Sequence, residues 1–158
     1  MKKLSLYIFL WLLLSINSNA NDISEYQIGG ISIGDSLLEH LSRDQIISEI
    51  ENNKSSYNYL NDDFGEVYIF KKIDGYYALT FMVKPKDKNF NIYSIRGLIN
   101  YDNKIEECLK KKKEIVKELS LVFIKTTQRE ETLEFDWDPT GESISYNTYF
   151  DFENGDYA

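Results

Sequence analysis

The feature that most constrains the fold is a long apolar repeat in the second half of the chain. Between residues 103 and 127, apolar side chains recur every three or four positions: Ile105, Cys108, Leu109, Ile115, Val116, Leu119, Val122 and Phe123. This spacing matches the period of an α-helix and places the apolar groups in one stripe. Asn103, followed by Glu106, is a suitable N-terminal cap. The sequence therefore predicts a helix of about six turns whose stripe is buried.

Alternating patterns on both sides of this repeat predict strands. Five segments show the pattern: residues 66–73, 76–84, 92–101, 132–137 and 144–153. A period of two is typical of antiparallel strands with one face in the core and one in water. The alternation puts Tyr77 on the same face as Leu79, and it makes Leu133 and Tyr146 core residues. Asp74-Gly75 has the composition of a two-residue hairpin turn, and residues 138–141 read as a second turn.

Two capping signals near the start of the chain predict a short helical pair. Ser36 with Glu39, and Ser42 with Gln45, have the spacing of a capping box. They favour two short helices, or one kinked helix, over residues 36–51. The predicted fold class is α+β: a mostly antiparallel sheet of about five or more strands, with the long amphipathic helix packed on it and the short helical pair near the N-terminus.

The first twenty residues have the order of a secretory signal peptide. Lys2 and Lys3 precede a run of thirteen residues, 4–16, that is almost entirely apolar, and small residues follow as far as Ala20. A membrane-spanning helix needs roughly 20 apolar residues, so the run is too short to span well. We predict a signal peptide over residues 1–20 and one domain over residues 21–158. The protein is then exported to the periplasm or secreted, without stable membrane insertion after cleavage; the alternative is an uncleaved anchor.

The charge of the chain excludes some partners. The formal net charge is −8, and it becomes −10 when Lys2 and Lys3 are removed with the leader. An acidic surface is repelled by phosphate backbones, so we expect no nucleic-acid partner.

The sequence lacks the residue sets on which common catalytic and cofactor sites depend. His40 is the only histidine, so a metal site with two histidines is excluded. Residues 136–142 faintly resemble a calcium-binding loop, but Asn147 stands where a bidentate glutamate is needed, and a solvated turn is the better interpretation. The acidic groups at residues 62–66 and 151–156 are read as surface acids, although a carboxylate pair could serve a hydrolase. We predict no catalytic residue, no metal and no cofactor.

The most unusual feature of the composition is its 12 tyrosines. Tyr57, Tyr59, Tyr76 and Tyr149 fall in predicted loops or at outward strand positions, where tyrosine provides binding area at low entropic cost. The alternative is that tyrosine simply favours strands. The leading hypothesis is an exported, non-catalytic module that binds another envelope or extracellular protein. A carboxylate-based hydrolase remains an alternative, as does an inhibitor or immunity-type partner of an enzyme, since an acidic surface suits a basic target.

Cys108 and the end of the chain raise a separate question. Cys108 is the only cysteine, which leaves open an intermolecular bond, a free thiol or a missing partner. Asn154-Gly155 is a strong hairpin signal, yet only three residues follow it. We expect this to be too few for a returning strand, so that the complete chain would extend beyond Ala158.

Three segments resemble a group of small exported proteins of marine bacteria that has no established activity. They are residues 23–42 (ISEYQIGGISIGDSLLEHLS), residues 92–120 (IYSIRGLINYDNKIEECLKKKKEIVKELS) and residues 152–158 (FENGDYA). The resemblance covers most of residues 23–158. It implies a continuation beyond Ala158 into a strand with a second cysteine, in which case Cys108 would form half of a disulfide.

Overall fold

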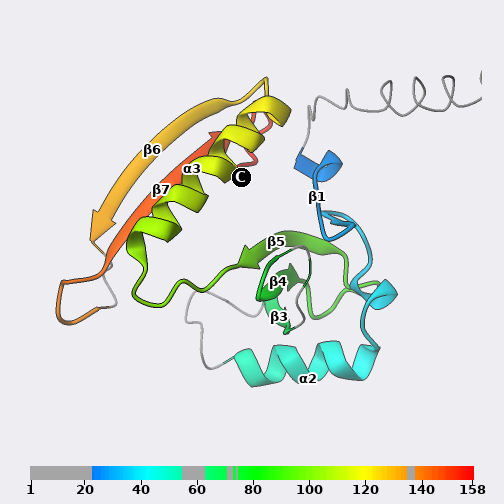
Figure 1. Cartoon of the computed structure of the whole chain (residues 1–158). Helices are drawn as coiled ribbons and strands as arrows, with labels where there is room; N and C mark the ends of the chain where they lie inside the picture. Colours follow the sequence, from blue (N-terminus) through cyan, green and yellow to red (C-terminus); the bar gives the residue numbers. More distant parts are fainter. Residues whose placement is uncertain (1–22, 55–62, 71–72, 74, 135–137) are drawn as a thin grey trace, which may run out of the picture. The chain divides into compact units, whose positions relative to one another are not determined.

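The computed structural model describes residues 23–54, 63–70, 73, 75–134 and 138–158 (Figure 1). The predicted signal peptide lies outside these residues. The chain divides into two compact units, Ser24–Cys108 and a second that includes Leu109–Ala158, and each is described by itself. No helix in the described part of the chain combines the length and apolar character needed to cross a membrane.

The described residues form two α-helices and seven antiparallel strands. The predicted α+β class is therefore confirmed. The expected single sheet of about five strands is not observed, because the strands form separate sheets of two, three and two strands. Hydrophobic alternation fixes which residues of one strand share a face, but it does not fix which strands pair, and here each sheet is built from consecutive strands.

The first unit contains a small hairpin, a helical segment and the three-stranded sheet. Its elements after the 3₁₀ turn η1 (Ile23–Glu25) are β1 (Gln27–Ile28), β2 (Ile31–Ser32), the 3₁₀ turn η2 (Leu37–Glu39), α2 (Arg43–Asn53), β3 (Gly65–Ile69), β4 (Ala78–Val83) and β5 (Ile92–Leu98).

The helical pair is confirmed as two short helices, η2 and α2. Ser42 accepts a hydrogen bond from the Gln45 amide, and the Gln45 side chain accepts one from the Ser42 amide, which is the predicted capping box. Ser36 caps η2 differently, since its hydroxyl accepts from the amide of Leu38. Helix α2 then places Ile46 and Ile50 in the core.

One face of the three-stranded sheet forms most of the core. The strands run in the order β3-β4-β5, with Val67 opposite Phe81 and Phe81 opposite Ile95. The buried apolar cluster consists of Ile31, Leu37, Ile46, Ile50, Val67, Leu79, Phe81, Val83, Phe90 and Ile92. Burial of each such side chain stabilises the fold by about 1.5–3 kcal/mol relative to exposure.

Tyr77 departs from the predicted alternation. The hairpin around Gly75 forms as expected, with the Tyr76 amide donating to the Ile73 carbonyl at 2.8 Å. Strand β4 begins only at Ala78, however, and Tyr77 lies in a bend before it with 56% of its surface exposed. Tyr77 is therefore not a core residue, whereas Leu79 is fully buried.

The second unit is a helix lying along a two-stranded ribbon (Figure 1). The helix is α3 (Ile105–Val122), most of which belongs to this unit, and the strands are β6 (Thr127–Glu134) and β7 (Ile144–Asp151). Just after α3, the ring of Phe123 packs edge-on against Phe150 and Phe152, with centroids 5.6 and 5.1 Å apart. These three buried rings join the end of the helix to the ribbon.

The predicted helix is present, but its stripe is not buried as expected. No residue of α3 is fully buried, and Ile105 and Leu121 are 55% and 72% exposed. A two-stranded ribbon is too narrow to cover the apolar side of so long a helix. Leu133 and Tyr146 lie on opposite faces of the ribbon and are 46% and 42% exposed, so the prediction that both are core residues is wrong.

The chain turns back on itself at Asn154-Gly155. Gly155 adopts the positive φ that such a turn requires. The Phe150 amide then donates to the Ala158 carbonyl at 2.9 Å, and the Ala158 amide donates to the Phe150 carbonyl at 3.1 Å. The last three residues therefore form one isolated bridge to β7, between Tyr157 and Asp151, and not a regular strand.

Candidate functional site

The candidate site lies on the face of the three-stranded sheet that is turned away from the core. Side chains alternate between the two faces of a strand, so Glu66 and Tyr68 of β3 lie on the opposite face from Val67. The register places Tyr68 opposite Thr80 and Thr80 opposite Arg96, in one row across β3, β4 and β5. We call this the outer face.

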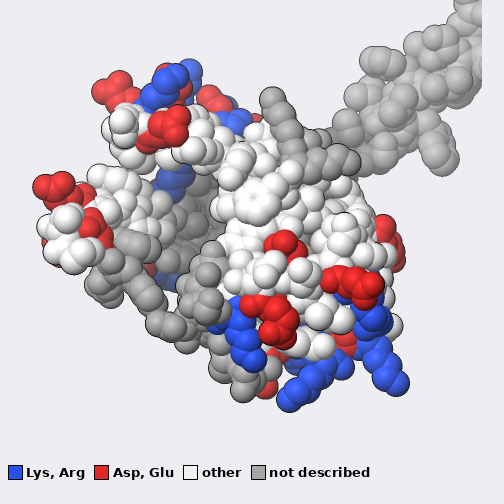
Figure 2. Space-filling view, turned by 90° about the horizontal axis from the view of Figure 1, so that it is seen from below, with Lys and Arg blue, Asp and Glu red and all other residues white. Residues whose placement is uncertain are grey.

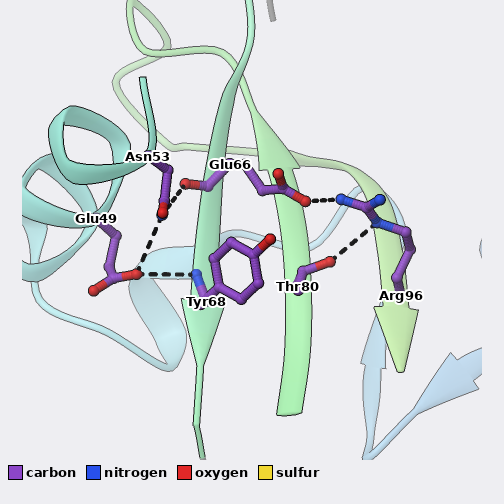
Figure 3. A network of polar contacts seen from close by, with 6 residues as sticks. All are labelled: Glu49, Asn53, Glu66, Tyr68, Thr80 and Arg96. Atoms are coloured by element: carbon purple, nitrogen blue, oxygen red, sulfur yellow. Dashed lines mark hydrogen bonds and ion pairs between the residues drawn. The ribbon is translucent and has the colours of Figure 1, made fainter. Parts of the chain in front are cut away.

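A buried ion pair occupies the outer face (Figure 3). The Glu66 carboxylate is fully buried and pairs with the Arg96 guanidinium, whose side chain is 47% exposed. Arg96 also donates from Nε to the Thr80 hydroxyl at 3.1 Å. Because an isolated charge in a protein interior is very costly, Arg96 compensates Glu66 and is itself fixed across two strands. The prediction that Glu66 is a surface acid is wrong.

Helix α2 holds the outer edge of β3 through side chains. The Glu49 carboxylate accepts a hydrogen bond from the Tyr68 amide at 3.3 Å, and the Asn53 amide group donates to the Glu66 carbonyl at 3.2 Å (Figure 3). These peptide groups point away from β4, where an edge strand would otherwise leave them unpaired. The bonds fix β3, and with it the outer-face side chains that β3 carries.

Three aromatic residues, one half-buried and two exposed, form a group at one end of the outer face. The rings of Tyr68 and Phe70 stack with centroids 5.5 Å apart, and the ring of Tyr77 meets Phe70 edge-on at 5.9 Å. Phe70 is 65% exposed and Tyr77 is 56% exposed. We call Tyr68, Phe70 and Tyr77 the aromatic cluster. Large aromatic rings grouped at the surface mark interaction sites more often than scattered ones do.

A second exposed aromatic pair in the same unit is covered by a lysine. Phe64 and Tyr93 meet edge-on at 5.5 Å, and the Lys84 ammonium lies over both rings, 4.7 Å from the centroid of Tyr93. The cation already occupies these ring faces. In the aromatic cluster, Phe70 and Tyr77 are 65% and 56% exposed, which makes the cluster the better candidate.

The four tyrosines predicted as a binding surface are divided between described and undescribed parts of the chain. Tyr57 and Tyr59 lie outside the described residues. Tyr76 is half-buried, and its ring fills the space beside Gly97, where an added Cβ would come within 2.4 Å of it. Tyr149 lies in the other unit, with the Arg129 guanidinium 4.1 Å above its ring.

Sequence reasoning missed Phe70 and Tyr77 because it assigned them to alternating strands. The available signal was their position beside the Asp74-Gly75 turn, where regular alternation ends.

The remaining predicted groups have structural surroundings. The Asp138 carboxylate accepts hydrogen bonds from the side chains and amides of Ser143 and Thr140, and these bonds lower its pKa. With the Gly141 amide donating to the Asp138 carbonyl, the preferred turn interpretation is confirmed. His40 is exposed at the end of η2, and Cys108 is a half-buried free thiol. Within the described ranges, acidic, histidine and cysteine side chains do not gather into a metal-binding group.

Charge does not single out a binding surface on the face that Figure 2 shows, where acidic and basic side chains are mixed. No family model matches the chain, and no curated protein or solved structure is significantly similar to it. The assignment of a function therefore depends on the geometry of the site alone.

Proposed function

We propose that the protein is an exported, non-catalytic binding module that holds another envelope or extracellular protein through the aromatic cluster on its outer face. The observation that carries the proposal is the exposure of Phe70 and Tyr77, 65% and 56%, as neighbouring rings in contact with each other. The chain is otherwise rich in charge, with 28% charged residues. Export follows from the leader and is part of the proposal.

The surroundings of the aromatic cluster suit recognition of a protein surface. Tyr68 belongs to a strand that is hydrogen-bonded to β4 on one side and to α2 side chains on the other, so its ring is presented on a rigid support. Aromatic rings lose little rotamer freedom on binding and are enriched among interface residues that dominate the affinity.

A comparison of two variants tests the proposal. Tagged wild-type protein, the double variant Phe70→Ser/Tyr77→Ser and the control Leu121→Ser are used to capture proteins from the exported fraction of the native host. Leu121 is 72% exposed but lies in the other unit, so the control removes an exposed apolar side chain elsewhere. We expect one protein to be retained by wild type and by the control. Its affinity for the double variant, measured with purified partner, should fall at least about 100-fold.

Two results would overturn the proposal. One is a partner that binds the double variant as tightly as it binds wild type, which would locate the binding surface elsewhere. The other is the absence of any specific partner together with turnover of peptide or glycan substrates, which would favour the hydrolase. Circular dichroism spectra of the three proteins show whether the variants keep the fold.

A further inference from the structure

A pocket in the second unit has the features of a ligand-binding site. It has a volume of about 370 Å³ and lies between α3 and the ribbon, well apart in sequence from the aromatic cluster. The helix side consists of Leu109, Lys112, Lys113, Val116 and Lys117, and the ribbon side consists of Glu130, Tyr146 and Thr148. All of these residues belong to the unit that includes Leu109–Ala158.

On the helix side of the pocket, the spacing of the residues places apolar and cationic side chains on one face of α3. Positions 109, 112, 113, 116 and 117 follow the three- and four-residue steps that define one face of a helix. Leu109 and Val116 therefore supply an apolar wall, while Lys112, Lys113 and Lys117 supply three positive charges. Among the described residues, Glu130 is the one acidic residue that lines the pocket. The local excess of positive charge contrasts with the formal net charge of −8 of the whole chain.

The ribbon side presents an unused polar group. The Thr148 hydroxyl oxygen is buried and has no hydrogen-bond partner among the described residues. A buried hydroxyl that forms no hydrogen bond costs about 1–3 kcal/mol in mutational data. Thr148 lies opposite Glu130 and is flanked on the same face by Tyr146, so its side chain belongs to the face of the ribbon that lines the pocket.

We propose that this pocket binds a small anionic amphiphile, a molecule with one apolar tail and one carboxylate or phosphate head. The tail would contact Leu109, Val116 and the ring of Tyr146. The head would pair with the three lysines, and a polar atom of the ligand would satisfy the Thr148 hydroxyl. This combination of apolar walls with a few convergent polar groups is typical of small-molecule sites.

The half-exposed stripe of α3 supports the same conclusion. Val116 and Leu109 are only partly buried although they lie on the apolar side of the helix. Lysine stems can lie along apolar surface while the ammonium groups reach solvent, which places the charges at the rim and the apolar groups below them. An amphiphile that enters from the rim would meet these groups in the same order as its own head and tail.

Calorimetric titration of the purified protein with three ligands that each contain ten carbon atoms tests the proposal. The probes are decanoate, decyl phosphate and decanol, all kept below the concentrations at which they aggregate. We expect saturable binding of one decanoate with a dissociation constant on the order of tens of micromolar. Decanol should bind at least 10-fold more weakly, because it lacks the charge. The ratio of decanoate to decyl phosphate affinity identifies the preferred head.

Two single variants locate the site. Lys112→Glu should weaken decanoate binding at least 10-fold, whereas Lys110→Glu, with the same change in charge at an exposed helix position outside the pocket lining, should weaken it less than 3-fold. Chemical shifts of the Tyr146 and Thr148 signals should change on titration. The proposal is overturned if decanoate shows no saturable binding, if decanol binds equally well, or if the two lysine variants behave alike. The three-ligand series uses the unaltered chain, so it tests the proposal even if a variant does not fold.

Discussion

Replacing Arg96 by methionine should destabilise the three-stranded sheet far more than the same replacement of Glu66. In Arg96→Met, the Glu66 carboxylate stays fully buried and loses its cation. In Glu66→Met, the remaining charge belongs to Arg96, whose side chain is already 47% exposed and can be hydrated. The two variants remove the same ion pair, yet they leave behind charges with very different access to water.

The burial of each partner sets the expected magnitudes. Loss of one partner from a buried pair costs about 3–5 kcal/mol, and the partial exposure of Arg96 points to the lower end, about 3 kcal/mol for Arg96→Met. For Glu66→Met we expect about 1 kcal/mol, since a hydrated guanidinium carries little penalty. The double variant should unfold within about 1 kcal/mol of wild type, because apolar replacement of both partners of a buried pair is often nearly neutral.

Amide hydrogen exchange is the suitable assay, because the chain forms two units that need not unfold together. Exchange of the Phe81 and Thr80 amides in β4 reports the opening free energy of the first unit alone. The coupling energy of the double-mutant cycle should reach about 3 kcal/mol. Arg129→Met is a matched control, since Arg129 pairs with Asp151 at the surface of the other unit and should change β4 exchange by less than about 0.5 kcal/mol.

Two results would refute this reasoning. If Arg96→Met stays within about 0.5 kcal/mol of wild type, the ion pair does not compensate a buried charge. If the two single effects simply add in the double variant, the Glu66 and Arg96 side chains do not interact energetically.

Three further predictions concern local contacts. Gly97→Ala should lower the opening free energy measured by exchange of the β4 amides by about 1–3 kcal/mol, because the new Cβ would lie within 2.4 Å of the Tyr76 ring. Tyr76→Ala in the same chain should recover part of this loss. Glu49→Ala should lower the opening free energy that protects the Tyr68 amide from exchange by about 1 kcal/mol, because it removes that amide's acceptor. The amides of β4 should change less. Hydrogen bonds hold the pKa of Asp138 below its ordinary value of 3.8. Their contribution to stability is therefore fully present above about pH 4 and is lost only as the pH falls through the lower pKa of the folded state. Acid titration followed by NMR should show the loop loosening there, and Asp138→Asn should remove this step.

Local signals in the sequence were sufficient for several elements. The Ser42–Gln45 capping box depends only on residues three apart, and it forms as predicted. The turn at Gly75 is equally local, and so is the helical period of α3, which begins at Ile105 and ends at Val122, inside the predicted range of residues 103–127. In each case the contacts that determine the element join residues that are close together in the sequence.

Contacts between distant residues explain what the sequence could not predict. Glu66 looks like one of many surface acids until β4 places Arg96 of the next strand within reach of it. Likewise, Leu133 and Tyr146 both sit in alternating segments, but the register of β6 on β7 puts them on opposite faces. The hydrophobic pattern within one strand does not determine which strand will pair with it.

The side-chain hydrogen bonds from α2 to β3 also make the two edges of the three-stranded sheet different. Glu49 and Asn53 occupy the outward peptide groups of Tyr68 and Glu66, so no additional strand can join on that side without breaking them. Extension of this sheet by a foreign strand, whether in a complex or in an aggregate, would have to start from β5 beyond Ile92, whose amide and carbonyl already bond Asp35 and Gly34.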